Sequence, residues 1–146
     1  MRAVVQRVSR ASVEIDGKMN GEISKGLVVF VAIKDSDNEK TVEWMSNKLV
    51  NLRIFPDEND KMNRSVLDVK GGILLISNFT LYGDAKKGFR PSFIESAKPE
   101  ISEPIFNKLL NYLKSNYDLK IETGKFGAMM NINLINDGPV TIIIDY

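Results

Sequence analysis

The residues GGILLISNFTLYGDAKKGFRPSF, at positions 71–93, combine a strong signal of fold with a signal of function. Their aliphatic run at positions 73–76 is typical of a buried strand. Polar side chains follow this run directly, at Ser77, Asn78 and Thr80. The loop after them carries the cations Lys86, Lys87 and Arg90. Hydroxyl and amide groups at the mouth of a buried strand, beside a basic loop, suit a site that handles an anionic substrate.

Outward from this stretch, further segments have the apolar runs or the alternation of strands. They are residues 4–15, 19–23, 27–33, 53–55, 119–122, 130–134 and 140–144. Asp16-Gly17 predicts a hairpin between the first two. The sequence Asn136-Asp137-Gly138-Pro139 predicts a turn between the last two.

Two segments have the patterns of helices. Ser36 and Glu39 fit a capping box, with Ser36 as the N-cap of a helix that runs to about residue 50. The second helix lies between about residues 99 and 117. It begins either at Pro99, which suits a first helical position, or at Ser102, which would put Pro104 in the first turn.

About eight strand segments and two helices favour an α+β fold with a curved or barrel-like, mainly antiparallel β-sheet. At 146 residues the chain is long enough to bury a core of its own. We therefore expect a single domain over residues 1–146.

The composition excludes several kinds of catalyst. The chain has no cysteine, which rules out disulfides, thiolate catalysis and soft-metal sites, and we expect neither a metal nor a cofactor. It also has no histidine, so the usual general base near neutral pH is missing and a Ser-His-Asp triad cannot form. The net charge of +1 predicts no strong, unselective attraction to nucleic acid, although local basic clusters could still bind phosphates.

No apolar run is long enough for a transmembrane helix, and the first ten residues do not resemble a signal peptide. These features make a cytoplasmic protein without a membrane partner the expectation.

Each candidate feature has an ordinary structural explanation beside the functional one. Ser77 and Thr80 could simply satisfy backbone groups at a strand end, and as nucleophiles they would lack a base. The basic loop could be a solvated surface, but Phe89 and Phe93 interleave with its cations, which favours contact with phosphates and bases. The Gly138-Pro139 turn could allow a backbone to approach a ligand closely.

In combination, these segments resemble the D-aminoacyl-tRNA deacylases, formerly called D-tyrosyl-tRNA deacylases. The resemblance covers essentially the whole chain and rests on four blocks in order: SNFTL at 77–81, RPSF at 90–93, TGKFGA at 123–128 and NDGPVT at 136–141. The opening QRVSRASV at 6–13 also fits the family. One departure is Asn78, where the family usually has the longer glutamine.

The resemblance implies a homodimeric editing enzyme that cleaves the ester between a D-amino acid, or glycine, and the 3′-terminal adenosine of tRNA. It implies that Gly138 and Pro139 form a cis dipeptide that enters the partner's active site and rejects L-amino acids. It also implies a catalytic strand with Ser77, Asn78 and Thr80, and substrate contacts at Phe79, Phe126 and Met130. We expect Lys86, Lys87 and Arg90 to contact the tRNA.

The resemblance implies catalysis assisted by the 2′-hydroxyl of the tRNA, which a chain without histidine or cysteine permits. Two alternatives stay open. One is an esterase with Thr80 as nucleophile, and the other is an RNA-binding module without catalytic activity.

Overall fold

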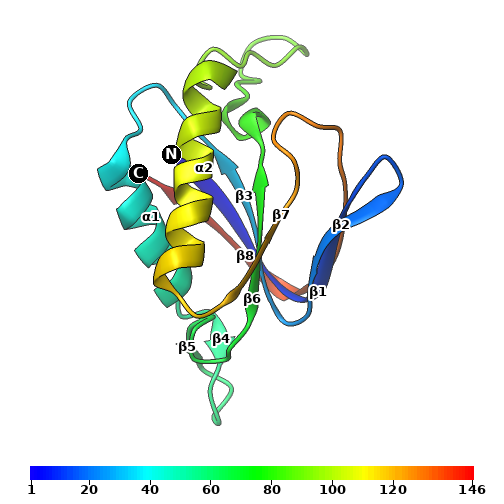
Figure 1. Cartoon of the computed structure of the whole chain (residues 1–146), viewed down its shortest axis with the longest axis vertical. Coiled ribbons are helices and arrows are strands. Elements are labelled where there is room, and N and C mark those ends of the chain that lie inside the picture. Colours follow the sequence, from blue (N-terminus) through cyan, green and yellow to red (C-terminus); the bar gives the residue numbers. More distant parts are fainter.

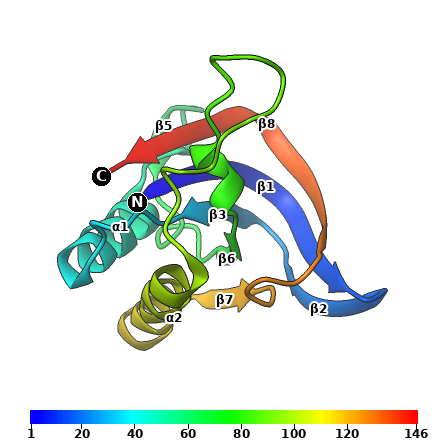
Figure 2. The same cartoon turned by 90° about the horizontal axis from the view of Figure 1, so that it is seen from above.

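The computed structural model describes residues 1–146, with two helices packed on one side of a strongly curved sheet (Figures 1 and 2). In chain order the elements are β1 (Arg2–Ile15), β2 (Lys18–Ile23), β3 (Gly26–Ala32), α1 (Glu39–Asn51), β4 (Phe55–Pro56), β5 (Met62–Arg64), β6 (Gly72–Ser77), the 3-10 helix η1 (Phe79–Tyr82), α2 (Pro99–Asn116), β7 (Lys120–Thr123) and β8 (Asn131–Asp145). No helix is long and apolar enough to span a bilayer.

Strand β1 is the long central strand of the sheet and pairs with three others. Strands β3 and β2 pair in turn with its first and second halves, and β8 pairs along nearly its whole length, all of them antiparallel. Strands β6 and β7 then extend the sheet from β3 in parallel. At the far side β7 meets β2, where the Asn20 side-chain amide donates to the Thr123 carbonyl at 2.7 Å. The sheet is therefore mostly antiparallel and nearly closed, which confirms the expected barrel-like α+β fold.

The strands β3 and β6 are apolar on both faces because both faces of the sheet are covered. Leu27, Val29 and Val31 face the larger core, which contains 23 buried residues and includes the inner faces of α1 and α2. Val28 and Leu74 belong to a smaller cluster of 7 buried residues on the other face. Continuous apolar runs in the sequence thus correspond to strands sandwiched between two clusters.

The start of α1 differs from the prediction. Its N-cap is Asn38, whose side chain accepts from the Lys40 amide, and Thr41 completes the capping box. Ser36 is therefore not the cap. The carboxylate of the next residue, Asp37, is buried and accepts from the Met1 and Lys34 nitrogens, which fixes the chain before the helix. Helix α2 begins at Pro99, one of the two predicted starts, and Pro104 lies inside it.

The first hairpin is confirmed, since Asp16 and Gly17 both have positive φ, as a tight turn between twisted strands requires. The predicted turn at residues 136–139 is wrong. Strand β8 is continuous through it, and the extra residues bulge out between Asn136, which pairs with Val8, and Thr141, which pairs with Gln6. The second predicted strand, residues 140–144, is thus the end of β8.

The two chain ends meet at a buried ion pair. The α-ammonium group of Met1 donates to the Asp37 carboxylate at 2.5 Å and to the Tyr146 carbonyl at 3.2 Å. The Asp37 side chain is only 1% exposed, and its other oxygen accepts from the Lys34 amide at 2.9 Å. This carboxylate therefore fixes the start of β1 against the loop before α1.

Replacing Asp37 with alanine should destabilise the fold strongly, because it leaves a buried ammonium group without its charged partner. We expect a loss of about 3 kcal/mol or more in the free energy of unfolding, measured by urea titration. Asp35→Ala is the matched control, since Asp35 is exposed. Equal losses in the two variants would contradict this role of Asp37.

Candidate functional site

An apolar cavity of about 590 Å³ opens at the carboxyl ends of β3 and β6. Its walls come from these strand ends, from η1, from the start of α2 and from the segment between β7 and β8. Of its 19 lining residues 13 are hydrophobic, and none carries an ionisable side chain. The polar groups of the lining are the side chains of Ser77, Asn78, Ser96 and Ser102.

Five of the predicted site residues meet in this cavity. They are Ser77, Asn78, Phe79, Phe126 and Met130. The prediction that one strand carries the polar group is only partly right, because β6 ends at Ser77 and residues 79–82 form a 3-10 turn. The turn is linked to β3 through the Asn78 amide, which donates to the Val31 carbonyl at 2.8 Å.

Thr80 lies beside the cavity lining and is exposed. Its hydroxyl donates to the Asn78 side-chain oxygen at 2.6 Å, so the Thr80 proton is directed at an amide and not at a base. The Asn78 side chain therefore has a defined contact in this chain.

Aromatic side chains form two walls of the cavity. Phe79 meets Phe93 edge to face, with ring centroids 5.2 Å apart. Phe126 packs on Phe106 of α2 at 6.0 Å between centroids. Ser96, which no sequence motif indicated, donates its hydroxyl to the Phe79 carbonyl at 2.6 Å and so holds the Phe79 wall in place.

The predicted basic residues Lys86, Lys87 and Arg90 lie outside the cavity on an exposed loop. This loop leaves from the end of η1 and returns to the cavity at Phe93. Phe89, near its middle, is fully exposed. Cations and an uncovered aromatic ring therefore lie on a loop whose two ends adjoin the cavity.

The 3-10 turn has a second support that the sequence motifs did not indicate. Arg2 donates from Nη1 to the Leu81 carbonyl at 3.1 Å and from Nε to Asp145 at 2.7 Å, with its guanidinium over the Tyr82 ring. Burial raises the pKa of Tyr82 to about 12, so its phenol stays protonated near neutral pH. The sequence around Arg2 gives no sign of this role, because its three partners lie far away along the chain.

Gly138 and Pro139 do not line the cavity of their own chain. They lie exposed on the bulge of β8, joined by a cis peptide bond. Arg7, which is buried, supports the bulge. Its Nε donates to the Asp137 carbonyl at 3.1 Å and lies 2.9 Å from the Asp137 carboxylate. Its Nη1 donates to the Ile54 carbonyl at 2.5 Å.

Asn136 fixes the other side of the bulge. Its side-chain amide donates to the Arg7 carbonyl at 2.9 Å and to the Val140 carbonyl at 3.1 Å. The sequence motifs did not reveal the supporting roles of Arg7 and Asn136. A cation inside an apolar strand was the available signal for Arg7.

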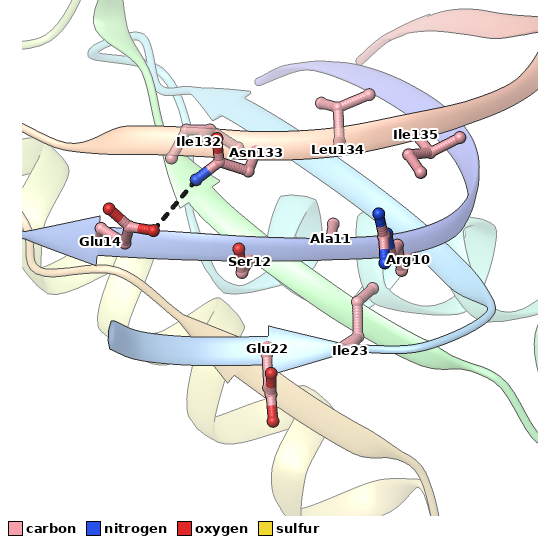
Figure 3. A pocket seen from close by; sticks show the side chains of 10 residues that line it. All are labelled: Arg10, Ala11, Ser12, Glu14, Glu22, Ile23, Ile132, Asn133, Leu134 and Ile135. Carbon is pink, nitrogen blue, oxygen red and sulfur yellow. Dashed lines mark hydrogen bonds between the residues drawn. The ribbon is translucent and has the colours of Figure 1, made fainter. Parts of the chain in front are cut away.

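A second cavity, of about 680 Å³, is lined by residues of β1, β2 and β8 (Figure 3). Arg10, Glu14 and Glu22 line it, and Asn133 donates to Glu14 at 3.3 Å. It contains none of the predicted site residues. It shares strand β8 with the Gly138-Pro139 bulge.

The sequence is similar to known deacylases along nearly its whole length. The family model described as D-Tyr-tRNA(Tyr) deacylase matches residues 4–145. Proteins named D-aminoacyl-tRNA deacylase are 51% identical in Thermosipho africanus and 54% identical in Fusobacterium nucleatum; each alignment covers 99% of this chain, and 97% and 95% of the relative.

Two solved structures have a similar fold. One titled c-Myc DNA Unwinding Element Binding Protein has a TM-score of 0.94 and 41% identity, covering 100% of this chain and 99% of that one. Another, of a probable eukaryotic D-amino acid tRNA deacylase, has a TM-score of 0.84 at 16% identity, covering 99% of this chain and 98% of that one, and supports the fold alone. By its sequence over nearly the full length, this chain belongs to the D-Tyr-tRNA(Tyr) deacylase family.

Proposed function

We propose that this protein hydrolyses the ester between a D-amino acid and the 3′-terminal adenosine of tRNA, in the cytoplasm, at the cavity lined by Ser77, Asn78 and Phe126. The relatives named D-aminoacyl-tRNA deacylase support this reaction class. The cavity supports it too, since it combines an apolar, aromatic lining with a few polar groups, as sites for small organic groups usually do.

The observation that carries the stereochemical part is the exposed Gly138-Pro139 dipeptide, which is held firmly by Arg7 and Asn136 but does not line its own cavity. In our proposal it enters the cavity of a second copy. Backbone atoms placed against the substrate α-carbon reject a Cβ on the L side and ignore the identity of a D side chain. Glycine has no Cβ and should pass, which adds glycyl-tRNA mischarged on tRNA(Ala) to the substrates.

The unpaired edge of β8 offers a surface for this second copy. Strand β8 pairs only with β1, and Ile135 and Ile143 on it are 47% and 67% exposed. The neighbouring part of β1 and β2 carries both signs of charge, at Arg10, Glu14 and Glu22. In a two-fold dimer each patch meets itself, so a patch with both signs of charge can be self-complementary.

The chemistry we propose uses the substrate as its own base. No ionisable side chain lines the cavity, and the Thr80 hydroxyl donates a hydrogen bond to the Asn78 side chain. The 2′-hydroxyl of the terminal adenosine, next to the ester, accepts a proton from the attacking water while it passes its own proton to the 3′-oxygen. Water adds to the carbonyl carbon, the bond to the 3′-oxygen breaks, and the amino acid leaves as the free acid. Positioning of this kind is worth up to about 7–11 kcal/mol, and each donor to the developing oxyanion about 3 kcal/mol.

In the test of the function, purified protein is incubated with D-tyrosyl-tRNA, L-tyrosyl-tRNA and glycyl-tRNA. We expect release of D-tyrosine and glycine, with L-tyrosyl-tRNA spared by at least about a hundredfold in rate, because rejection rests on a steric clash with backbone. Equal rates for the D and L esters, or tRNA binding without hydrolysis, would overturn the proposal. The second of these results would favour a non-catalytic RNA-binding module.

Two substitutions distinguish hydrolysis assisted by the 2′-hydroxyl from a mechanism in which Thr80 attacks the ester. Substitution of the terminal adenosine by its 2′-deoxy form should stop hydrolysis, whereas Thr80→Ala should slow it by about tenfold because the hydrogen bond to Asn78 is removed. Single-turnover assays and mass spectrometry check both. A covalent acyl-enzyme, or complete loss of activity in Thr80→Ala with normal turnover of the 2′-deoxy substrate, would establish the esterase alternative.

We further propose that Lys86, Lys87 and Arg90 contact tRNA phosphates, and that Phe89 stacks on an unpaired base near the 3′ end. Lys86→Ala/Lys87→Ala should raise KM and reduce the slope of log KM against log salt by about 0.7–0.9 for each lysine that pairs with a phosphate. Phe89→Ala should raise KM without changing that slope, with Ile94→Ala, also highly exposed on this loop, as its control. Unchanged KM values would show that the loop does not touch the tRNA.

A further inference from the structure

Gly124 contacts a residue that lines the cavity, and it does so more closely than any other residue type would allow. A Cβ added at Gly124 would lie 2.2 Å from the sulfur of Met130, which is far inside the contact distance of about 3.5–4.0 Å. The φ of Gly124 is not in the left-handed region, unlike that of Gly127. This position therefore requires glycine for space and not for backbone conformation.

Met130 is half-buried and lies between an apolar cluster and the cavity. Val13, which is fully buried, also contacts the added Cβ, with Cγ2 at 3.5 Å. Met130 also packs against the smaller apolar cluster, which includes Val8 and Leu74. The open space beside Met130 is the cavity that it lines. A methyl group at 124 would thus push the thioether into that cavity by more than about 1 Å.

We propose that Gly124 is a positioning residue, which sets the depth of the cavity by letting the Met130 side chain lie against the backbone at the end of β7. This rests on the proposed function, since it assumes that the cavity takes the aminoacyl end of tRNA. A side chain at position 124 should change the cavity more than the stability of the fold, because the flexible Met130 side chain can rearrange at little cost. Alanine in place of glycine also reduces the freedom of the unfolded chain, which offsets part of any strain.

The test is a double-mutant cycle at positions 124 and 130, read out by Tm, KM and kcat on D-tyrosyl-tRNA. Gly124→Ala should leave Tm within a few degrees of the parent and raise KM about tenfold, because a substrate site is sensitive to displacements of about 1 Å. Valine has no atom at the δ position, so in a Met130→Val background the same Gly124→Ala change should leave KM unaltered.

Gly21→Ala is the matched control. Gly21 lies in β2 against β7, and an added Cβ there would be 3.1 Å from Glu122 Oε2 and 3.3 Å from the Thr123 carbonyl, away from Met130. We expect a lower Tm with unchanged KM. A glycine that matters only for packing would behave like Gly21.

Two results would overturn the inference: no rise of KM in Gly124→Ala, or the same rise in both backgrounds at position 130. Should Met130→Val lower Tm, Met130→Ala provides the second background. The assay separates this inference from the proposed function, because failure of the latter means that the parent protein itself does not hydrolyse D-tyrosyl-tRNA.

Discussion

The pairing of β8 with β1 across a register break is the constraint on which the rest of this structure depends. Between Asn136 and Thr141 strand β8 advances five residues, while its partner advances two, from Val8 to Gln6. The register shifts again between Val8 and Arg10, and the ladder is regular beyond these two shifts, so the surplus residues of β8 have to leave the sheet here. Arg7 and Asn136 bond to both ends of the bulge, so Gly138 and Pro139 project from a fixed base.

This constraint separates the two halves of the proposed site. The cavity belongs to the other end of the sheet, where β3 and β6 stop and η1 begins, and its walls are neutral and mostly apolar. Polar groups in such a cavity interact more strongly with a bound group, since apolar walls screen them less than water would. Such a site is suited to holding an activated ester in place, and the reacting groups are then water and the substrate's own hydroxyl.

Much of this could be predicted from sequence, and the failures have physical causes. The apolar runs at β3 and β6 and the glycine-containing hairpin after β1 depend on neighbours in sequence, so local patterns were enough. Residues 136–139 have a strong local preference for a turn, but β8 pairs with β1 both before and after them, and this pairing overrides the preference. The cap of α1 moved to Asn38 because the buried ion pair between Asp37 and Met1 fixes the chain just before the helix.

The candidate site was predictable where residues lie close in sequence and not where their partners are distant. Ser77, Asn78 and Phe79 adjoin a recognisable strand, and Phe126 and Met130 came from family resemblance. Arg7 and Gly124 act through partners about 130 and 6 residues away, at Asp137 and Met130, and their meaning appears only with coordinates. A glycine that makes room for a thioether has no local signature.

The central claim is that Gly138 and Pro139 of one copy complete the cavity of another. Since the chain contains no cysteine, Thr80→Cys and Gly138→Cys variants can be mixed, allowed to exchange subunits and mildly oxidised without competing thiols. A disulfide requires Cα atoms within about 7 Å. We expect a covalent heterodimer on a non-reducing gel, well above the yield with Lys18→Cys in place of Gly138→Cys. No heterodimer, or equal yields with the two partners, would contradict the claim.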